Sequence, residues 1–371
     1  MHTQSKFRLL VVRLGAMGDI LHALPAVTAL RKAHPGWVID WVVEPRWRAL
    51  LSVEQQCAAP QGPEPTPPSA SSQSRQSLVH PVIDHLHPAP TRDWRKVPFS
   101  GATLHGIKDL RRALKAGDYD TVIDLQGAMR SAVIGRMAGC QRLIGEAEPR
   151  ERSARWLYTE RVQTHAAHVI EQDLELAAAI AGDDLAFAAP MLPVDPSAEA
   201  WADRTLPLGA SQPAVLINPG AGWGAKRWPV ERYATLAQGL MERGMRVLIN
   251  AGPGEEPLAD SLASAIHGGV EVIVPTLSQL IAVTRRIALC IAGDTGPLHL
   301  ACALGRPVVG IYGPTDPSRN GPFGTRFAVL RSPDSRRDHT RHEAPEAGLL
   351  TIEPEDVLKA ADKLLSEENA G

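Results

Sequence analysis

Residues 7–43 read FRLLVVRLGAMGDILHALPAVTALRKAHPGWVIDWVV, and this stretch decides the fold. The apolar run 7–12 is typical of a fully buried parallel strand. A glycine-rich turn follows it, residues 20–33 have helical periodicity, and 37–43 form a second apolar run. Strand, glycine turn, helix and strand make a βαβ unit, the first unit of a doubly wound parallel sheet.

The same alternation continues along the chain. In the first half we predict strands at 82–85 and 121–125 and helices at 104–116 and 171–181. In the second half we predict strands at 214–218, 246–250, 272–274, 287–291 and 307–312, with helices at 230–243, 256–266, 277–286 and 298–304 between or after them. The pattern predicts an α/β protein with two Rossmann-like doubly wound domains that face each other across a cleft.

The expected domain boundary lies in the proline-containing stretch 182–212. Residues 1–182 would form the first domain and residues 183–352 the second, while a last helix near 353–367 could return to pack on the first. Residues 55–78 are rich in Pro, Ser and Gln, so we expect an exposed, mobile insertion without a chemical role there.

Composition narrows the functional classes. The 371 residues carry a formal net charge of -2, which argues against general nucleic-acid binding. The four cysteines are scattered without a Cys-x-x-Cys pair, so structural zinc is not expected and a reducing, cytoplasmic setting fits best. No window approaches ~18 uninterrupted apolar residues, so no membrane-spanning helix is predicted, while peripheral attachment stays open.

The first candidate motif is residues 13–19, RLGAMGD, at the end of the first strand. Its glycines let the backbone approach a ligand, and Asp19 stands where a helix begins. Asp19 is therefore either a catalytic carboxylate or an ordinary helix cap, and position alone does not decide. A full Gly-x-Gly-x-x-Gly fingerprint is absent, which disfavours dinucleotide binding.

Three further motifs follow strands of the second half. In residues 292–299, AGDTGPLH, Thr295 and Gly296 open a helix whose free N–H groups suit phosphate, with His299 one turn on. In 218–229, NPGAGWGAKRWP, a glycine-rich loop leads to Lys226, which could neutralise a diphosphate. In 251–256, AGPGEE, a carboxylate stands where a ribose diol could be held. The plainer alternatives are an Asp N-cap, solvated cations and a bare turn.

A cationic stretch, residues 92–96 (RDWRK), completes the set, joined by Arg130 and Arg150 on later loops. Clustered cations beside an aromatic ring suit a phosphorylated or carboxylated acceptor. The alternative is a solvated basic face, and only convergence in space distinguishes the two.

In this order, the motifs resemble the ADP-heptose glycosyltransferases that build the inner core of lipopolysaccharide, glycosyltransferase family 9. The resemblance rests on the segments MGDILH (17–22), LPA (24–26), DWVVE (40–44), WRK (94–96), YDTVIDLQG (119–127), KRWP (226–229), GDTG (293–296) and YGPTDP (312–317).

The resemblance implies a GT-B fold and an inverting transferase that needs no metal and no cofactor. It implies transfer of L-glycero-D-manno-heptose from ADP-L-glycero-D-manno-heptose to Kdo of Kdo2-lipid A, at the cytoplasmic face of the inner membrane with its anionic surface. Asp19 would be the general base and Lys226 a donor-phosphate contact. The other implied donor contacts are Gly220, Glu255 (ribose), Asp294 (heptose hydroxyls), Thr295, Gly296 and His299. The implied acceptor contacts are Arg13, Arg92, Arg95, Lys96, Arg130 and Arg150.

The chain departs from the family pattern in its 55–78 insertion, at Asp93, where a cation is expected, and at Gly222, where a hydroxyl residue is common. These departures concern the acceptor more than the donor. Three alternatives stay open: a heptosyltransferase for another inner-core acceptor, a nucleotide-sugar epimerase on the same fold, and a sugar-nucleotide sensor without catalysis.

Overall fold

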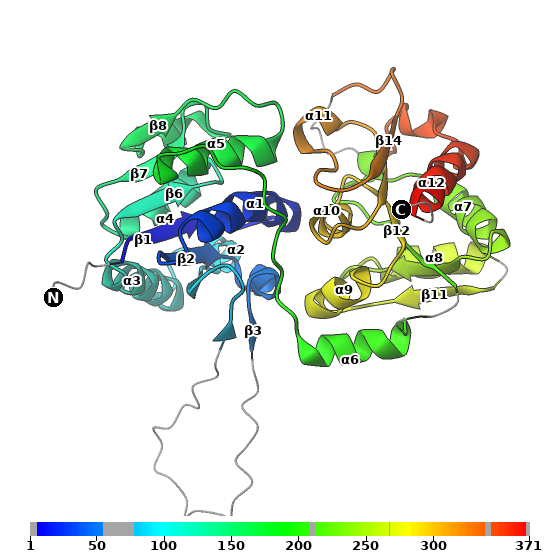
Figure 1. The fold of residues 1–371 in the computed structure, drawn as a ribbon, viewed down its shortest axis with the longest axis horizontal. Helices are drawn as coiled ribbons and strands as arrows, with labels where there is room; N and C mark the ends of the chain where they lie inside the picture. The colour runs from blue at the N-terminus through cyan, green and yellow to red at the C-terminus, as the bar shows by residue number, and fades with distance from the viewer. Residues whose placement is uncertain are drawn as a thin grey trace, which may run out of the picture.

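The structure is a computed structural model that describes residues 6–54, 78–207, 209, 212–266, 268–337 and 343–368. The expected insertion at 55–78 therefore lies almost entirely outside the described residues. Two six-stranded parallel sheets, each with its own helices, stand side by side (Figure 1). The predicted α/β class with two Rossmann-like doubly wound units is confirmed.

The first sheet has the order β5-β2-β1-β6-β7-β8. Its strands are β1 (Arg8–Val12), β2 (Val38–Val43), β5 (His85–Pro88), β6 (Thr121–Asp124), β7 (Leu143–Glu146) and β8 (Glu160–Val162). Its helices are α1 (Met17–Ala33), α2 (Thr91–Lys96), α3 (Gly101–Ala116), α4 (Met129–Met137) and α5 (Val169–Ala181), with 3-10 turns at Pro45–Leu50 and Arg152–Trp156. A short antiparallel pair, β3 (Val53–Glu54) and β4 (Leu78–Val79), flanks the described ends of the insertion.

The second sheet repeats this order as β11-β10-β9-β12-β13-β14. Its strands are β9 (Ala214–Asn218), β10 (Arg246–Asn250), β11 (Val270–Ile273), β12 (Leu289–Gly293), β13 (Val308–Tyr312) and β14 (Phe327–Arg331). Its helices are α6 (Pro196–Thr205), α7 (Val230–Glu242), α8 (Glu256–Ala265), α9 (Leu277–Thr284), α10 (Gly296–Ala303), α11 (Pro317–Asn320) and α12 (Pro354–Glu368), with 3-10 turns at Gly224–Lys226 and Leu349–Thr351.

The central strands are buried on both faces. In β1, Leu9 to Val12 have no exposed surface, and β1 pairs with β2 on one side and β6 on the other. Helices cover both faces of a parallel sheet, which is why such a strand is a continuous apolar run rather than an alternating one. One hydrophobic core contains β1 and α1 together with α10 and β12, so the two halves are packed against each other and not merely tethered.

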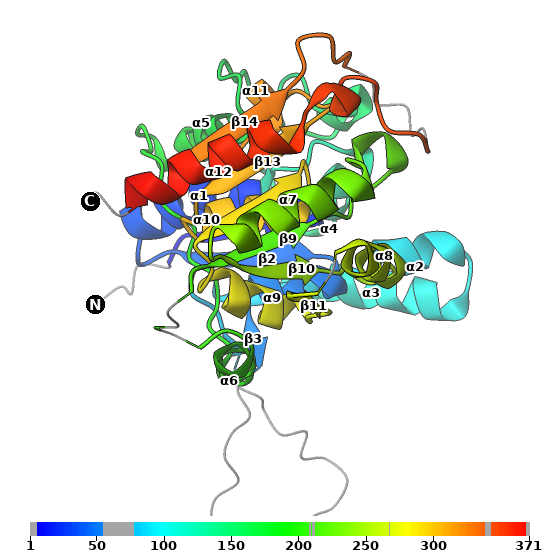
Figure 2. The ribbon, with the colours of Figure 1, turned by 90° about the vertical axis from the view of Figure 1, so that its right-hand side faces the viewer.

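Two sequence expectations differ from the structure. The stretch 182–212, predicted as a linker, contains α6, which packs against α9 in the second half. The expectation that the last helix returns to the first domain is wrong. Helix α12 lies beside α7 and against β13 and β14, because its apolar face shares the core of the second sheet (Figure 2). Among the described helices, none has the length and apolar character that crossing a bilayer requires.

Candidate active site

Both sheets reverse their strand order at the same place, between their first and fourth strands. Ligands of doubly wound proteins bind outside the carboxyl ends of the strands at this point. The loops that follow β1, β6, β9 and β12 meet around one cavity of about 700 Å³. Its lining includes Arg13, Asp19, His22, Gln126, Arg150 and Asp173 from the first half, and Trp223, Lys226, Asp294, Thr295, Gly296 and His299 from the second.

The two motifs that begin α1 and α10 touch across this cavity. A Cβ atom added to Gly18 would lie 2.9 Å from Cδ2 of His299, and one added to Gly296 would lie 2.6 Å from Sδ of Met17. Both distances are shorter than carbon contacts allow, so each glycine lets the opposite helix approach. The glycines of both motifs thus bring the halves together as well as leaving room for a ligand.

Asp19 lies in the first turn of α1 and faces the cavity. Its Oδ2 accepts a hydrogen bond of 2.7 Å from the backbone N–H of Ala16, so the carboxylate does cap the helix. Its Oδ1 lies 3.5 Å from Nη2 of Arg13, and 35% of the side chain is exposed. Capping and catalysis are therefore compatible, because one oxygen is held and the other stays open to the cavity with a cation beside it.

Lys226 and Asp294 form an ion pair on the opposite side. Each side chain is about a tenth exposed, and the carboxylate also accepts from His299, whose Nε2 lies 3.2 Å from Oδ1. Burial alone would raise the pKa of Asp294, but hydrogen bonds and charges from His299 and Lys226 hold it well below its usual range. The ammonium group of Lys226 also lies 4.3 Å from the ring centre of Trp223. The structure thus brings together three of the predicted donor residues.

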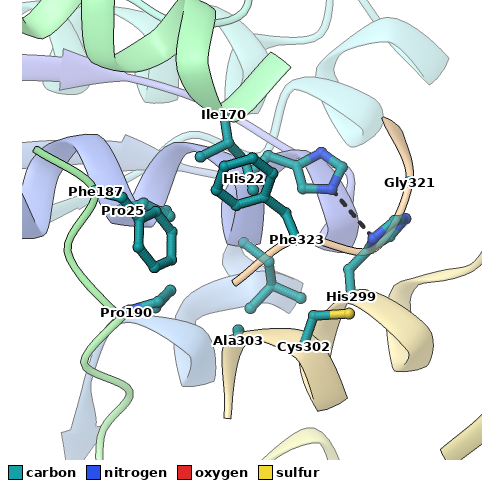
Figure 3. A pocket seen from close by; sticks show the side chains of 11 residues that line it. His22, Pro25, Ile170, Phe187, Pro190, His299, Cys302, Ala303, Gly321 and Phe323 are labelled. Carbon is teal, nitrogen blue, oxygen red and sulfur yellow. Dashed lines mark hydrogen bonds between the residues drawn. The ribbon is translucent and has the colours of Figure 1, made fainter. Parts of the chain in front are cut away.

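A pair of histidines continues this network into the first half. Nε2 of His22, one turn after Asp19 on α1, lies 3.1 Å from Nδ1 of His299 (Figure 3). A small pocket of about 20 Å³ lies behind the pair, closed by side chains such as Pro25, Phe187 and Phe323. Burial lowers the pKa of His22 well below its ordinary value, and the facing His299 lowers it further. His22 is therefore a neutral link between the halves at neutral pH.

Two of the other donor candidates, Gly220 and Glu255, form a second group at the same edge of the second sheet, whereas Thr295 and Gly296 line the main cavity. A Cβ atom on Gly220 would lie 2.2 Å from the carboxylate of Glu255, and Oε2 of Glu255 accepts from the backbone N–H of Gly252 at 3.1 Å. The described lining of the main cavity does not include Gly220 or Glu255, which follow the neighbouring strands β9 and β10. Thr295 precedes α10 and donates its hydroxyl to the carbonyl of Gly293.

The predicted acceptor cations divide into two groups. Arg13, only 6% exposed, and Arg150 line the main cavity. Arg92, Arg95 and Lys96 line a separate cavity of about 440 Å³. Arg130 is exposed at the start of α4, and the described residues that line these two cavities do not include it. The expected convergence of all six cations on one site is therefore only partial.

Several lining residues were not singled out by the sequence. Arg46, directly after β2, lies in the second cavity with Glu44, whose carboxylate accepts from the hydroxyl of Thr91 and the backbone N–H of Arg92. A cation at the carboxyl end of a parallel strand was the available signal for Arg46. Asp173 comes from the middle of α5, where nothing in the local sequence marks it.

Asp124 and Gln126 belong to a segment that the resemblance included without a role. Asp124 accepts from the backbone N–H groups of Gln126 and Gly127 and from the hydroxyls of Ser131 and Tyr158. Burial raises the pKa of Asp124, although these hydrogen bonds favour its charged form. Oε1 of Gln126 then accepts from the backbone N–H of Leu14 at 2.8 Å, which joins this loop to the Asp19 loop. Among the described residues, no group of three or more His, Cys, Asp or Glu could hold a metal ion.

Comparison with known proteins gives one consistent result. A family model described as glycosyltransferase family 9 (heptosyltransferase) matches residues 107–349. The protein named lipopolysaccharide heptosyltransferase 1 of Escherichia coli strain K12 is 32% identical over 335 residues, which are 88% of this chain and 94% of that protein.

Two solved structures share the fold over nearly the whole chain. The E. coli heptosyltransferase WaaC with ADP has a TM-score of 0.73 and 28% identity, covering 96% of this chain and 100% of that one. The same enzyme with ADP-2-deoxy-2-fluoro heptose has a TM-score of 0.71 and 28% identity, covering 96% and 99%. The predicted GT-B arrangement of two facing Rossmann-like units is confirmed by this likeness and by the two sheets.

Proposed function

The chain belongs to glycosyltransferase family 9, the heptosyltransferases, and from this membership we propose that it transfers heptose from ADP-heptose to a sugar of the lipopolysaccharide core. One observation carries the proposal further than membership does. Asp19 of the first half faces the Lys226–Asp294 ion pair of the second across a single cavity of about 700 Å³. A base and a donor-phosphate cation on opposite walls are what transfer between two bound substrates requires.

The donor belongs to the second half, about residues 183–352. Solved relatives carry ADP and ADP-2-deoxy-2-fluoro heptose, which supports ADP-L-glycero-D-manno-heptose as the donor. Lys226 and the free N–H groups at the start of α10, near Thr295 and Gly296, would neutralise the diphosphate without a metal ion. We propose that the carboxylate of Glu255, held over Gly220, accepts from ribose hydroxyls and that Asp294 accepts from the heptose, with His299 holding Asp294.

The reaction we propose is a single displacement that inverts the anomeric carbon. Asp19 removes the proton of the acceptor hydroxyl while its oxygen bonds to the anomeric carbon of heptose. The bond from that carbon to the diphosphate oxygen breaks, and ADP leaves with the electron pair. Lys226 stabilises the charge that develops on the leaving group. Packing of α1 on α10 keeps water from the donor while both substrates are bound.

The acceptor belongs to the first half, about residues 1–182, and we propose Kdo of Kdo2-lipid A. Arg13 and Arg150 beside Asp19 suit the carboxylate of the reacting sugar acid. The cavity of about 440 Å³ with Arg46, Arg92, Arg95 and Lys96 suits phosphates further along the same molecule. Arg130, exposed at the start of α4, would act only as a long-range cation.

An acceptor with a lipid tail must be reached at a membrane, and the α2–α3 corner is the surface we propose for this contact. Its apolar side chains are unusually open: Phe99 is 91% exposed, Val97 56% and Leu104 57%. They follow Arg95 and Lys96 directly, which gives the corner an apolar tip with a cationic rim. Such a combination favours peripheral binding to an anionic bilayer surface, here the cytoplasmic face of the inner membrane.

ADP release with defined acceptors tests the proposal. The purified protein is incubated with ADP-heptose alone, with Kdo2-lipid A, and with the already heptosylated lipid. The proposal predicts rapid ADP release only with Kdo2-lipid A. Release with the heptosylated lipid alone would assign another inner-core acceptor, and conversion of the donor sugar without acceptor would indicate an epimerase. Binding of ADP-heptose without release in any mixture would indicate a sensor and refute transfer.

A further inference from the structure

Asp173 contributes a buried carboxyl group to the wall of the main cavity. It projects from α5, is 3% exposed and contributes to the cavity lining. Its Oδ2 is buried and has no hydrogen-bond partner among the residues that the structure describes. Buried polar atoms are nearly always hydrogen-bonded, so an unpaired carboxyl oxygen in the wall of a substrate cavity needs an explanation.

The groups around Asp173 cannot satisfy it. Among the described residues, the cation with the largest effect on the charge of Asp173 is Arg13, whose guanidinium already contacts Asp19 and donates to the carbonyl of that residue at 3.1 Å. The other charged groups that face it are carboxylates, on α1 (Asp19), β6 (Asp124) and β7 (Glu146). Asp124 is held by four donors, as described above, and Glu146 accepts from the hydroxyl of Thr164 at 2.8 Å. Asp173 is thus the carboxyl for which this cluster has no donor left.

These surroundings favour the protonated acid. Burial is the largest of the effects that together raise the pKa of Asp173 to about 7. The charge of Arg13 opposes it, and the negative charges of Asp19, Glu146 and Asp124 add to it. A protonated carboxyl group has an O–H donor, whereas a carboxylate can only accept. The protonated Asp173 then supplies an O–H donor in the wall of the cavity.

We propose that Asp173 binds the acceptor as a neutral acid, donating its O–H to an oxygen of the sugar acid beside the hydroxyl that Asp19 deprotonates. The proposal rests on the proposed transfer to an anionic sugar. Two carboxyl groups of one cavity then have different tasks. Asp19 is 35% exposed with Arg13 beside it, whereas Asp173 has neither solvent nor a free cation. An ionised Asp173 would repel an anionic acceptor. Protonation of Asp173 therefore controls the affinity for the acceptor and leaves the affinity for the donor unchanged.

The test compares Asp173→Asn and Asp173→Ala with wild type over about pH 5.5 to 9. Asparagine keeps the shape and an N–H donor at every pH. For wild type, kcat/KM for the acceptor should fall about tenfold per pH unit above about pH 7, because the acid form is lost. In Asp173→Asn this fall should disappear, and in Asp173→Ala the value at pH 6 should drop about tenfold or more. KM for ADP-heptose should stay the same in both.

The matched control is Asp183→Asn, which removes an exposed carboxyl group just after α5 and should behave as wild type.

A fall above pH 7 that persists unchanged in Asp173→Asn would overturn the inference. A second measurement covers the case in which the variant is inactive. The pKa of Asp173 is raised from its ordinary value of 3.8 to about 7 in the folded protein. Its effect therefore lowers the free energy of unfolding progressively as the pH rises from about 4 to about 7, and by a constant amount at higher pH. The Tm of Asp173→Asn relative to wild type should therefore rise between about pH 5 and pH 8, and a constant difference would contradict the proposal. Absence of transfer to every acceptor would instead refute the proposed function, while the Tm result would still decide the state of Asp173.

Discussion

Lys226 and Asp294 show how one buried pair can serve both stability and chemistry. Their side chains are 10% and 11% exposed, so water replaces neither partner easily. His299 holds the second carboxylate oxygen, and His22 extends the contact to α1. A ligand phosphate that recruits Lys226 must therefore compete with Asp294, and His299 keeps the carboxylate partly satisfied while it does.

Replacing Lys226 with Met should separate these effects. Removing one member of a buried pair leaves Asp294 uncompensated and should destabilise the fold by about 3 kcal/mol. It should also weaken ADP binding and slow transfer about a hundredfold, because the diphosphate charge is less stabilised. Lys108→Met, an exposed lysine on α3, is the control. Calorimetry and ADP titration check both effects, and unchanged ADP affinity would argue against Lys226 as a phosphate contact.

At the scale of elements, the contact between the first turns of α1 and α10 determines the geometry of the site. Gly18 faces His299 and Gly296 faces Met17, at distances that leave no room for a side chain. The strand order reversal, together with these two glycines, brings the Asp19 loop opposite the Asp294 loop.

Gly18→Ala should open this contact. The added carbon would lie 2.9 Å from the ring of His299, so the helices must separate or His299 must turn. We expect a stability loss of about 1–3 kcal/mol and a fall in kcat of about tenfold or more, because small misplacements of reacting groups are costly. Gly36→Ala is the control, since a Cβ there meets nothing within 4 Å. Wild-type kcat in Gly18→Ala would show that the approach of the helices is not required.

The sequence predicted the central strands well and the edges poorly. Strands β9 and β10 match their predicted bounds because they are buried apolar runs, whereas the strand expected at 82–85 lies at His85–Pro88. Strands β7, β8 and β14 were not predicted from the sequence. Strands β8 and β14 are edge strands without fully buried residues, and β7 is an inner strand of only 4 residues. Helix α6 begins with a helix-start signal, Asp195 followed by Pro196, and the Asp195 carboxylate accepts from the backbone N–H groups of Ser197 and Ala198. The other prolines of the stretch nevertheless favoured a linker.

For the site, motifs at strand ends were visible and contacts between distant segments were not. Asp19, Lys226 and Asp294 follow glycine-rich turns, which is the local signal of a ligand loop. Asp173 and His22 lie inside helices, and their meaning depends on groups from other elements that only the fold brings near. The sequence alone likewise could not predict whether Arg130 and Arg150 share a site.

At the scale of the whole molecule, the cavity that Arg92, Arg95 and Lys96 line lies in the same half as the exposed α2–α3 corner. This arrangement suits an enzyme that lifts its acceptor from a bilayer while the other half supplies the donor from solution. The roles we propose for the two halves rest on the residues that each contributes: Asp19 with Arg13 and Arg150 from one, and the Lys226–Asp294 pair with Glu255 from the other.

Phe99→Ser tests the membrane contact. Phe99 is 91% exposed, so its removal should leave Tm unchanged. Binding to vesicles that contain anionic lipid should weaken about tenfold, since burial of an aromatic side chain is worth about 1.5–3 kcal/mol. Trp156, which is 71% exposed and ends the 3-10 turn at Arg152–Trp156, provides the control variant Trp156→Ser. Equal loss of binding in both variants would contradict a specific docking corner.

The central claim is that Asp19 is the base of a transferase whose donor is held by the other half. Single-turnover transfer of heptose to Kdo2-lipid A by Asp19→Asn, with ADP affinity measured in the same preparation, tests it most directly. Asparagine retains an oxygen that can accept from Ala16, so α1 stays capped. The account predicts wild-type ADP affinity and a transfer rate about 10²–10⁴ times lower. Transfer at the wild-type rate with ADP affinity intact would contradict it.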